Sequence, residues 1–134
     1  SDDAIDLNNC KNVIIKNNII KNSKDKGISI GNKKELAHSE RITIKNNLIF
    51  NNKIGISLKN HAQAIISMCL LQDNKLGISI DKPENIISPF KLAIDSSVFI
   101  NNSKTTTVNT KLKLSKAFAF STFIIFISTP KSSD

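Results

Sequence analysis

The sequence predicts an all-β protein that winds as a right-handed parallel β-helix, a solenoid of about four to five rungs, and three observations support this. Gly-Ile-Ser followed by an aliphatic residue occurs three times, at 27–30, 55–58 and 77–80. Isoleucine dominates the apolar residues with 23 copies, and its β-branched side chain favours strands. Asparagine, with 17 copies, gathers between the apolar segments, where it favours turns.

The first repeated unit is a short strand. Residues 4–7, Ala-Ile-Asp-Leu, align with the three Gly-Ile-Ser units at steps of 23, 28 and 22 residues. In each unit the second and fourth residues are aliphatic, so we expect them to point into a common core. Another step of 28 residues from Gly77 reaches Thr105, so "TTTV" at 105–108 is predicted to be a fifth, weaker strand.

A second unit recurs between the first, with alternating aliphatic residues, and it covers 13–22, 42–52, 64–74 and 92–102. Strands with a period of 22 to 28 residues fit a coil in which each turn adds one rung at about 4.8 Å. Like residues then stack in columns. One column is predicted at a bend, with left-handed backbone geometry and amides that bond the next rung. Its members are Asn18, Asn47, Cys69 and Ser97.

The chain is predicted to form one domain over 1–134, as part of a longer solenoid. The repeat is clearest over 1–102, and 103–134 is expected to be a weaker terminal rung or an irregular end. The alternation at 117–128 suggests a strand, and this apolar stretch is too short for a bilayer span of roughly 20 residues. We therefore expect no transmembrane span, and the sequence does not predict an oligomeric state.

Composition limits the partners. The net charge of +8, with 18 lysines and only Arg41 as arginine, attracts polyanions, although an A/T-rich genome would produce the same excess of lysine, asparagine and isoleucine. A nucleic-acid binder more often carries arginine and stacking aromatics, so no nucleic-acid partner is expected. Cys10 and Cys69 do not have metal-ligand spacing.

Motif order in 1–60 resembles that of polygalacturonase-type glycoside hydrolases, within the pectin-lyase-like superfamily of β-helix proteins. That family carries a paired Asp-Asp, then Gly-His-Gly-Ile-Ser-Ile-Gly, then Arg-Ile-Lys one rung later. Here the pair is Asp2-Asp3, and residues 25–31 read Asp-Lys-Gly-Ile-Ser-Ile-Gly, with Lys26 in place of the histidine. Residues 57–59 read Ser-Leu-Lys, with serine in place of the arginine.

This resemblance implies a carbohydrate-associated module, extracellular or at the cell envelope, that binds or acts on an acidic polysaccharide. As an enzyme it would be a hydrolase, lyase or epimerase. The rival interpretation is a non-catalytic structural or surface repeat, and some β-helix proteins that look like this repeat have no known catalysis.

The candidate site residues follow from the register. The glycine and serine columns, Ala4/Gly27/Gly55/Gly77 and Asp6/Ser29/Ser57/Ser79, are expected to face solvent as a flat polar strip for an extended sugar chain. Paired carboxylates at one site can act as general acid and base, can hold calcium, or can form an acidic rung neutralised by Lys24 and Lys26. No cofactor is expected to be required, and Ca²⁺ is the one metal ion that the acidic residues suggest. The candidates are Asp2 and Asp3 for catalysis; Asp6, Asp25, Lys26, Ser29, Ser57 and Lys59 for substrate binding; and Asp2, Asp3, Asp6 and Asp25 for calcium.

Overall fold

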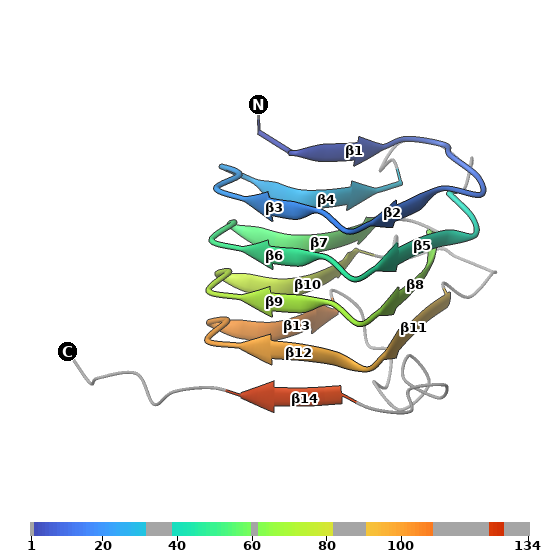
Figure 1. Ribbon diagram of the computed structural model, residues 1–134. Helices are drawn as coiled ribbons and strands as arrows, with labels where there is room; N and C mark the ends of the chain where they lie inside the picture. The colour runs from blue at the N-terminus through green and yellow to red at the C-terminus, as the bar shows by residue number, and fades with distance from the viewer. Residues whose placement is uncertain (1, 32–38, 60–61, 82–90, 109–123, 128–134) are drawn as a thin grey trace.

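The chain winds as a right-handed parallel β-helix in which three parallel sheets run along one axis (Figure 1). The structure, a computed structural model, describes residues 2–31, 39–59, 62–81, 91–108 and 124–127. Each of the first four rungs contributes one strand to each sheet in the order sheet 1, sheet 2, sheet 3, so that β1, β2 and β3 form rung 1; β13 and β14 extend sheets 1 and 3 beyond these rungs. The predicted fold class is confirmed.

The strands are short, as the Asn-rich connections require. Sheet 1 consists of β1 (Ile5–Leu7), β4 (Lys26–Ile30), β7 (Ile54–Lys59), β10 (Leu76–Asp81) and β13 (Lys104–Val108). Sheet 2 consists of β2 (Ile14–Lys16), β5 (Ile42–Lys45), β8 (Gln63–Ser67) and β11 (Lys91–Asp95). Sheet 3 consists of β3 (Ile19–Lys21), β6 (Leu48–Phe50), β9 (Leu70–Gln72), β12 (Ser97–Ile100) and β14 (Ile124–Ile127).

The register between rungs matches the alignment of the repeats. Ile28 pairs with Ile5 on one side and with Ile56 on the other, and Ile78 continues the column. The fifth strand is confirmed, because β13 places Thr106 beside Ile78. The second repeated unit forms two strands, one in sheet 2 and one in sheet 3, because the chain bends between them. The bend falls at an Asn pair in rungs 1 and 2, at Met68-Cys69 in rung 3 and at Ser96-Ser97 in rung 4.

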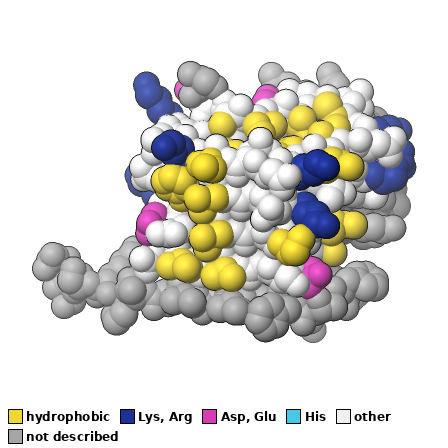
Figure 2. Space-filling view, in the orientation of Figure 1, with side chains coloured by type: hydrophobic (Ala, Val, Ile, Leu, Met, Phe, Trp, Pro, Cys, Tyr) yellow, Lys and Arg dark blue, Asp and Glu magenta, His cyan; other side chains and the backbone are white. Residues whose placement is uncertain are grey.

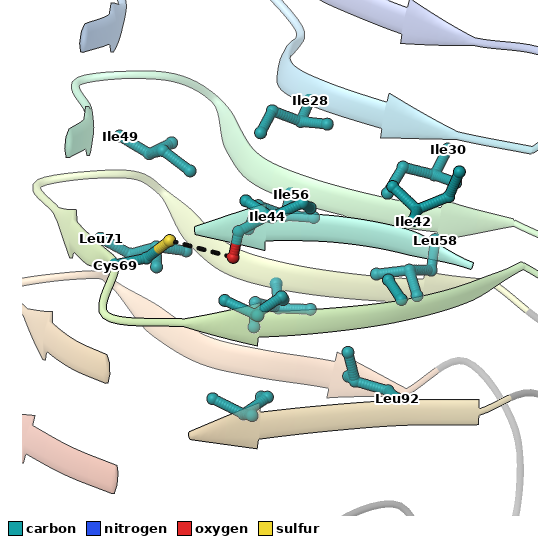
Figure 3. Close-up of a cluster of buried hydrophobic side chains, with 14 of the residues drawn as sticks. Ile28, Ile30, Ile42, Ile44, Ile49, Ile56, Leu58, Cys69, Leu71 and Leu92 are labelled. Atoms are coloured by element: carbon teal, nitrogen blue, oxygen red, sulfur yellow. Dashed lines mark hydrogen bonds between the residues drawn. The ribbon is translucent and has the colours of Figure 1, made fainter. Parts of the chain in front are cut away.

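The core is a tube of aliphatic side chains. Ile28, Ile44 and Ile56 are completely buried, and Figure 3 shows side chains of sheet 1 facing those of sheets 2 and 3. Phe99 is the only aromatic residue among the buried hydrophobic residues of the described chain. Stacked isoleucines therefore supply most of the apolar burial, at roughly 25 cal/mol per Å² of apolar surface.

Two bends per rung rely on left-handed backbone geometry. In the bend between sheets 2 and 3 the residue with positive φ comes one position before the predicted column. It is Asn17, Asn46, Met68 or Ser96, with φ between 45° and 60°. The predicted column of Asn18, Asn47, Cys69 and Ser97 instead bonds the rungs together: the N–H of Asn18 donates to Asn47 Oδ1 at 2.9 Å, and that of Cys69 donates to Ser97 Oγ at 3.2 Å.

A second ladder, which the sequence analysis missed, stands at the bend between sheets 3 and 1. It consists of Asn52, Asn74 and Asn102, each at most 8% exposed. Asn74 Oδ1 accepts bonds from the backbone and side-chain N–H groups of Asn52, both at 3.0 Å. The Asn74 amide donates to the Ile49 carbonyl and to Asn102 Oδ1, again at 3.0 Å. One side chain thus bonds groups on both neighbouring rungs and joins three rungs together.

The glycines of sheet 1 face the interior, and the expected outward glycine column is wrong. A Cβ on Gly27 would lie 2.7 Å from the carbonyl oxygen of Gly55 and 3.3 Å from the Ile20 side chain, which is buried in the core. Gly55 is confined in the same way by Gly77. The strand bends at this position so that two successive residues face inward, and only glycine leaves the required space.

Replacing Asn74 with alanine is expected to lower the free energy of unfolding by roughly 2–4 kcal/mol, because buried polar groups on the neighbouring rungs lose their partners. Urea unfolding followed by circular dichroism measures the change. Asn18→Ala is the matched control, since Asn18 is exposed at the end of its ladder, and we expect it to cost less than half as much. Equal losses for the two variants would contradict a structural role specific to the buried ladder.

Candidate functional site

The candidate site is a cluster of charges where the bend after β3 leads into β4. Lys26 is the first residue of β4, and its side chain is 15% exposed. Its Nζ lies 3.4 Å from Asp3 Oδ1 and also contacts Asp25 Oδ2. The backbone N–H of Lys26 donates to the same Asp3 oxygen at 3.1 Å. Lys26 therefore joins the two rungs at this point.

Lys53 extends this cluster to the next rung. Its Nζ lies 3.5 Å from Asp25 Oδ1, so Asp25 lies between two lysines. Lys53 was not among the site residues predicted from the sequence. The signal for it was the register, which stacks residue 53 below residue 25.

The charges in the cluster hold one another ionised. The hydrogen bond from Lys26 lowers the pKa of Asp25, burial opposes this, and the charges of Lys26 and Lys53 reinforce it. Burial would lower the pKa of Lys26, but its hydrogen bond with Asp25 and the charges of Asp3 and Asp25 outweigh burial and raise it. A general acid must hold a proton near neutral pH, so Asp25 is unsuited to that role.

The other two predicted site carboxylates, those of Asp2 and Asp6, take no part in the described ion pairs of this cluster. Asp2 is exposed, and its backbone carbonyl accepts a bond from the N–H of Asp25 at 2.8 Å. Asp6 is exposed and accepts a bond from the Asn8 amide at 3.1 Å. Among the described residues no group of three or more His, Cys, Asp or Glu side chains has a metal-binding arrangement. The contacts therefore give no support to the predicted calcium ligands Asp2, Asp3, Asp6 and Asp25.

The serine column of sheet 1 is buried, and the expected solvent-facing strip is wrong. Ser29 and Ser57 are 0% exposed and Ser79 is 4% exposed. Lys59 Nζ donates to Ser29 Oγ at 2.9 Å, which engages two of the predicted substrate-binding residues with each other. A sugar chain lying on the surface would not reach these hydroxyls.

The predicted site residues therefore form two separate groups of contacts. Asp3, Asp25 and Lys26 form one cluster, and Ser29 with Lys59 forms another contact. Residues 26 and 29 are three positions apart in β4, roughly 10 Å along the strand. The first cluster is consistent with the interpretation of an acidic rung neutralised by lysine, and Asp2 and Asp6 do not contribute side chains to either pairing in the described contacts.

Replacing Ser57 with alanine is expected to raise the free energy of unfolding by about 1 kcal/mol. Its buried Oγ has no hydrogen-bond partner among the described residues, and an unpaired buried hydroxyl is destabilising. The control is Ser29→Ala, which loses the bond to Lys59 and is expected to be destabilising. Chemical denaturation measures both. A loss for Ser57→Ala as large as that for Ser29→Ala would show that Ser57 Oγ has a partner.

The acid sensitivity of the fold is expected to depend on Asp25. Its pKa in the folded state lies below the ordinary 3.8, so its stabilising effect is complete above that value and disappears as the pH falls through the lowered pKa. Asp25→Asn should lower stability at pH 7, and the difference from the parent protein should shrink below about pH 4.

Thermal unfolding from pH 7 to pH 2 measures this difference. The matched background is Lys26→Met, in which Asp25→Asn should have a smaller effect at pH 7, because the main partner of Asp25 is already absent. An unchanged effect in that background would contradict the assignment of the lowered pKa to Lys26.

Comparison with known proteins agrees with the geometry. A family model described as "Right handed beta helix region" matches residues 1–120. No curated protein and no solved structure matches the chain. No helix in the described part of the chain is long and apolar enough to cross a membrane. The stacked rungs and the family match agree, and the chain belongs to the right-handed β-helix family.

Proposed function

We propose that this chain is a β-helix module that binds an acidic polysaccharide at the extracellular surface or the cell envelope. The observation that carries the proposal is a group of exposed lysines on successive rungs at the bend between sheets 3 and 1, here called the lysine edge. It consists of Lys53 and Lys75, which stack on each other, and of Lys24, the chain neighbour of Asp25 on the preceding rung.

The backbone of the rungs sets the spacing of the lysine edge. The N–H of Leu76 donates to the Lys53 carbonyl at 3.0 Å, and the N–H of Lys75 donates to the Asn52 carbonyl at 3.1 Å. Lys53 and Lys75 are therefore on adjacent rungs, about 4.8 Å apart. The Lys53 side chain is 59% exposed even though it pairs with Asp25. An extended polymer with one carboxylate per sugar can meet one amine per rung when it lies parallel to the solenoid axis.

Binding at the surface is favoured over catalysis because several predicted site residues already contact one another. Asp3, one of the two predicted catalytic residues, is ion-paired with Lys26. Among the predicted substrate-binding residues, Asp25 also pairs with Lys26, and Lys59 bonds Ser29. A hydrolase, lyase or epimerase acting here would first have to break these contacts. Surface lysines, in contrast, exchange water and counter-ions for a polyanion without rearranging the fold.

A structural repeat without a ligand is the second candidate, and the burial of Ser29 and Ser57 favours it. Much of the unusual composition has a structural role, because isoleucine fills the core and asparagine forms the ladders and bends. In that case the lysine edge only keeps the surface soluble.

Changing Lys24, Lys53 and Lys75 together to glutamine is expected to weaken binding to polygalacturonate about tenfold or more, since each exposed ion pair contributes up to about 1 kcal/mol. Isothermal titration calorimetry at about 0.15 M salt measures the affinity, with a neutral glucan as the uncharged control ligand.

The matched control variant changes Lys16, Lys21 and Lys45 to glutamine, which removes the same charge from exposed positions on sheets 2 and 3. We expect a much smaller loss for this variant. Equal losses would mean that net charge alone attracts the polymer, and the absence of binding by the parent protein would favour the structural repeat.

A further inference from the structure

The outer faces of sheets 2 and 3 carry large apolar side chains in contact with solvent. Ile14 is 64% exposed, Ile19 68%, Ile65 53% and Met68 49%. Figure 2 shows groups of apolar side chains on the face formed by these two sheets, with basic and acidic side chains beside them. We call this surface the apolar face. Exposed apolar surface of this kind marks interaction sites.

The apolar face consists of four outward columns, as the register defines them. Two columns belong to sheet 2: Ile14, Thr43, Ile65 and Ala93; and Lys16, Lys45, Ser67 and Asp95. Two belong to sheet 3: Ile19, Leu48, Leu70 and Val98; and Lys21, Phe50, Gln72 and Ile100. In each column the four residues come from rungs 1 to 4 in order. The residues between them, such as Ile15 and Ile20, are buried in the core.

Charge changes sign along the axis of this face. In the second of the two sheet 2 columns, rungs 1 and 2 carry Lys16 and Lys45, rung 3 carries Ser67, and rung 4 carries Asp95. Both lysines are exposed and Asp95 is half-buried. A partner that complements this order needs negative charge opposite rung 1 and positive charge opposite rung 4.

A second copy of the chain, turned end for end, supplies that order. We propose that the apolar face is the interface of an antiparallel homodimer, with the two-fold axis in the plane of the interface, perpendicular to the solenoid axis, and passing between rungs 2 and 3. Lys16 then faces Asp95 of the other copy, and this contact occurs twice because a two-fold interface is isologous.

The apolar columns are self-complementary under the same rotation. A large side chain meets a smaller one where Ile14 faces Ala93 and Ile65 faces Thr43. In sheet 3, Ile19 faces Val98 and Leu48 faces Leu70. Each aliphatic residue in these two columns therefore meets an apolar or small partner. In the remaining column of sheet 3 the rotation sets Lys21 opposite Ile100 and Phe50 opposite Gln72, so that no like charges meet.

The size of the face sets the strength of the dimer. Four rungs span roughly 19 Å along the axis, and seven or eight residues across two sheets span about 25 Å. This area is at the low end for specific interfaces, so we expect a dissociation constant on the order of micromolar. The net charge of +8 opposes association, and salt near 0.15 M limits that repulsion to about 8 Å.

Sedimentation equilibrium over a range of protein concentrations tests the proposal. The parent chain should dimerise, and Lys16→Glu or Asp95→Lys should each raise the dissociation constant at least tenfold. The double variant with both changes should regain the affinity. An equimolar mixture of the two single variants should also form dimers, because the glutamate introduced in one chain then faces the lysine introduced in the other.

Two controls separate the interface from general charge and from folding. Lys75→Glu makes the same charge change as Lys16→Glu outside the apolar face and should leave the dissociation constant unchanged. Thermal unfolding of each variant shows whether the fold is intact. A parent chain that stays monomeric at millimolar concentration would overturn the proposal, and so would double or mixed variants that fail to recover while remaining folded.

An anionic membrane surface is the competing occupant of a face with exposed isoleucines and lysines. Binding to phosphatidylserine vesicles that is lost in Ile19→Asp, with a parent chain that remains monomeric, would replace the second copy by a lipid surface and overturn the dimer. This outcome is distinct from failure of the proposed polysaccharide binding, because the lysine edge lies at another bend of the rung.

Discussion

The stacking of one rung on the next is the constraint on which the rest of the structure depends. Backbone hydrogen bonds between rungs hold the three sheets, and the buried Asn52, Asn74 and Asn102 satisfy the backbone where the sheets are interrupted at a bend. Since an unpaired buried amide is costly, successive rungs must place their ladder residues directly above one another. The repeat can therefore vary in length only in connections that leave this vertical alignment unchanged, and its steps are 23, 28 and 22 residues.

The same constraint explains why the polar residues of sheet 1 are structural. At Gly27 and Gly55 the backbones of adjacent rungs approach so closely that a side chain does not fit. One residue later the isoleucine fills the core, and the serine after it is buried with its hydroxyl bonded to Lys59 or left without a partner among the described residues. The Gly-Ile-Ser repeat is therefore a packing motif.

Periodicity predicted the fold because the recurring residue types show which positions stack in one column. Ile28, Ile56 and Ile78 had to stack, and Thr106 was found by counting residues. Local conformation was harder to predict: both residues of an Asn-Asn pair tolerate positive φ, and only the vertical bonds decide that Asn46 adopts it while Asn47 faces inward. Solvent exposure was harder still, because alternation shows which face Ser29 occupies but not what covers that face. The ion pairs of Asp25 were predicted in part: Lys26 was expected to neutralise the acidic rung, whereas the pair with Lys53, on the next rung, was not predicted.

A solenoid turns differences between its repeats into gradients along its axis. Where the columns are uniform, as in the isoleucine core and the asparagine ladders, they provide cohesion and carry no direction. Where they vary, as from Lys16 through Lys45 to Asp95, the charge of the surface changes along the axis, and a partner can complement that order. The lysine edge, in contrast, repeats a lysine at the same position of two successive rungs, Lys53 and Lys75, and this repetition suits a regular polyanion. Uniform and graded columns thus suit different partners, and one set of stacked rungs can present both without any change in the core.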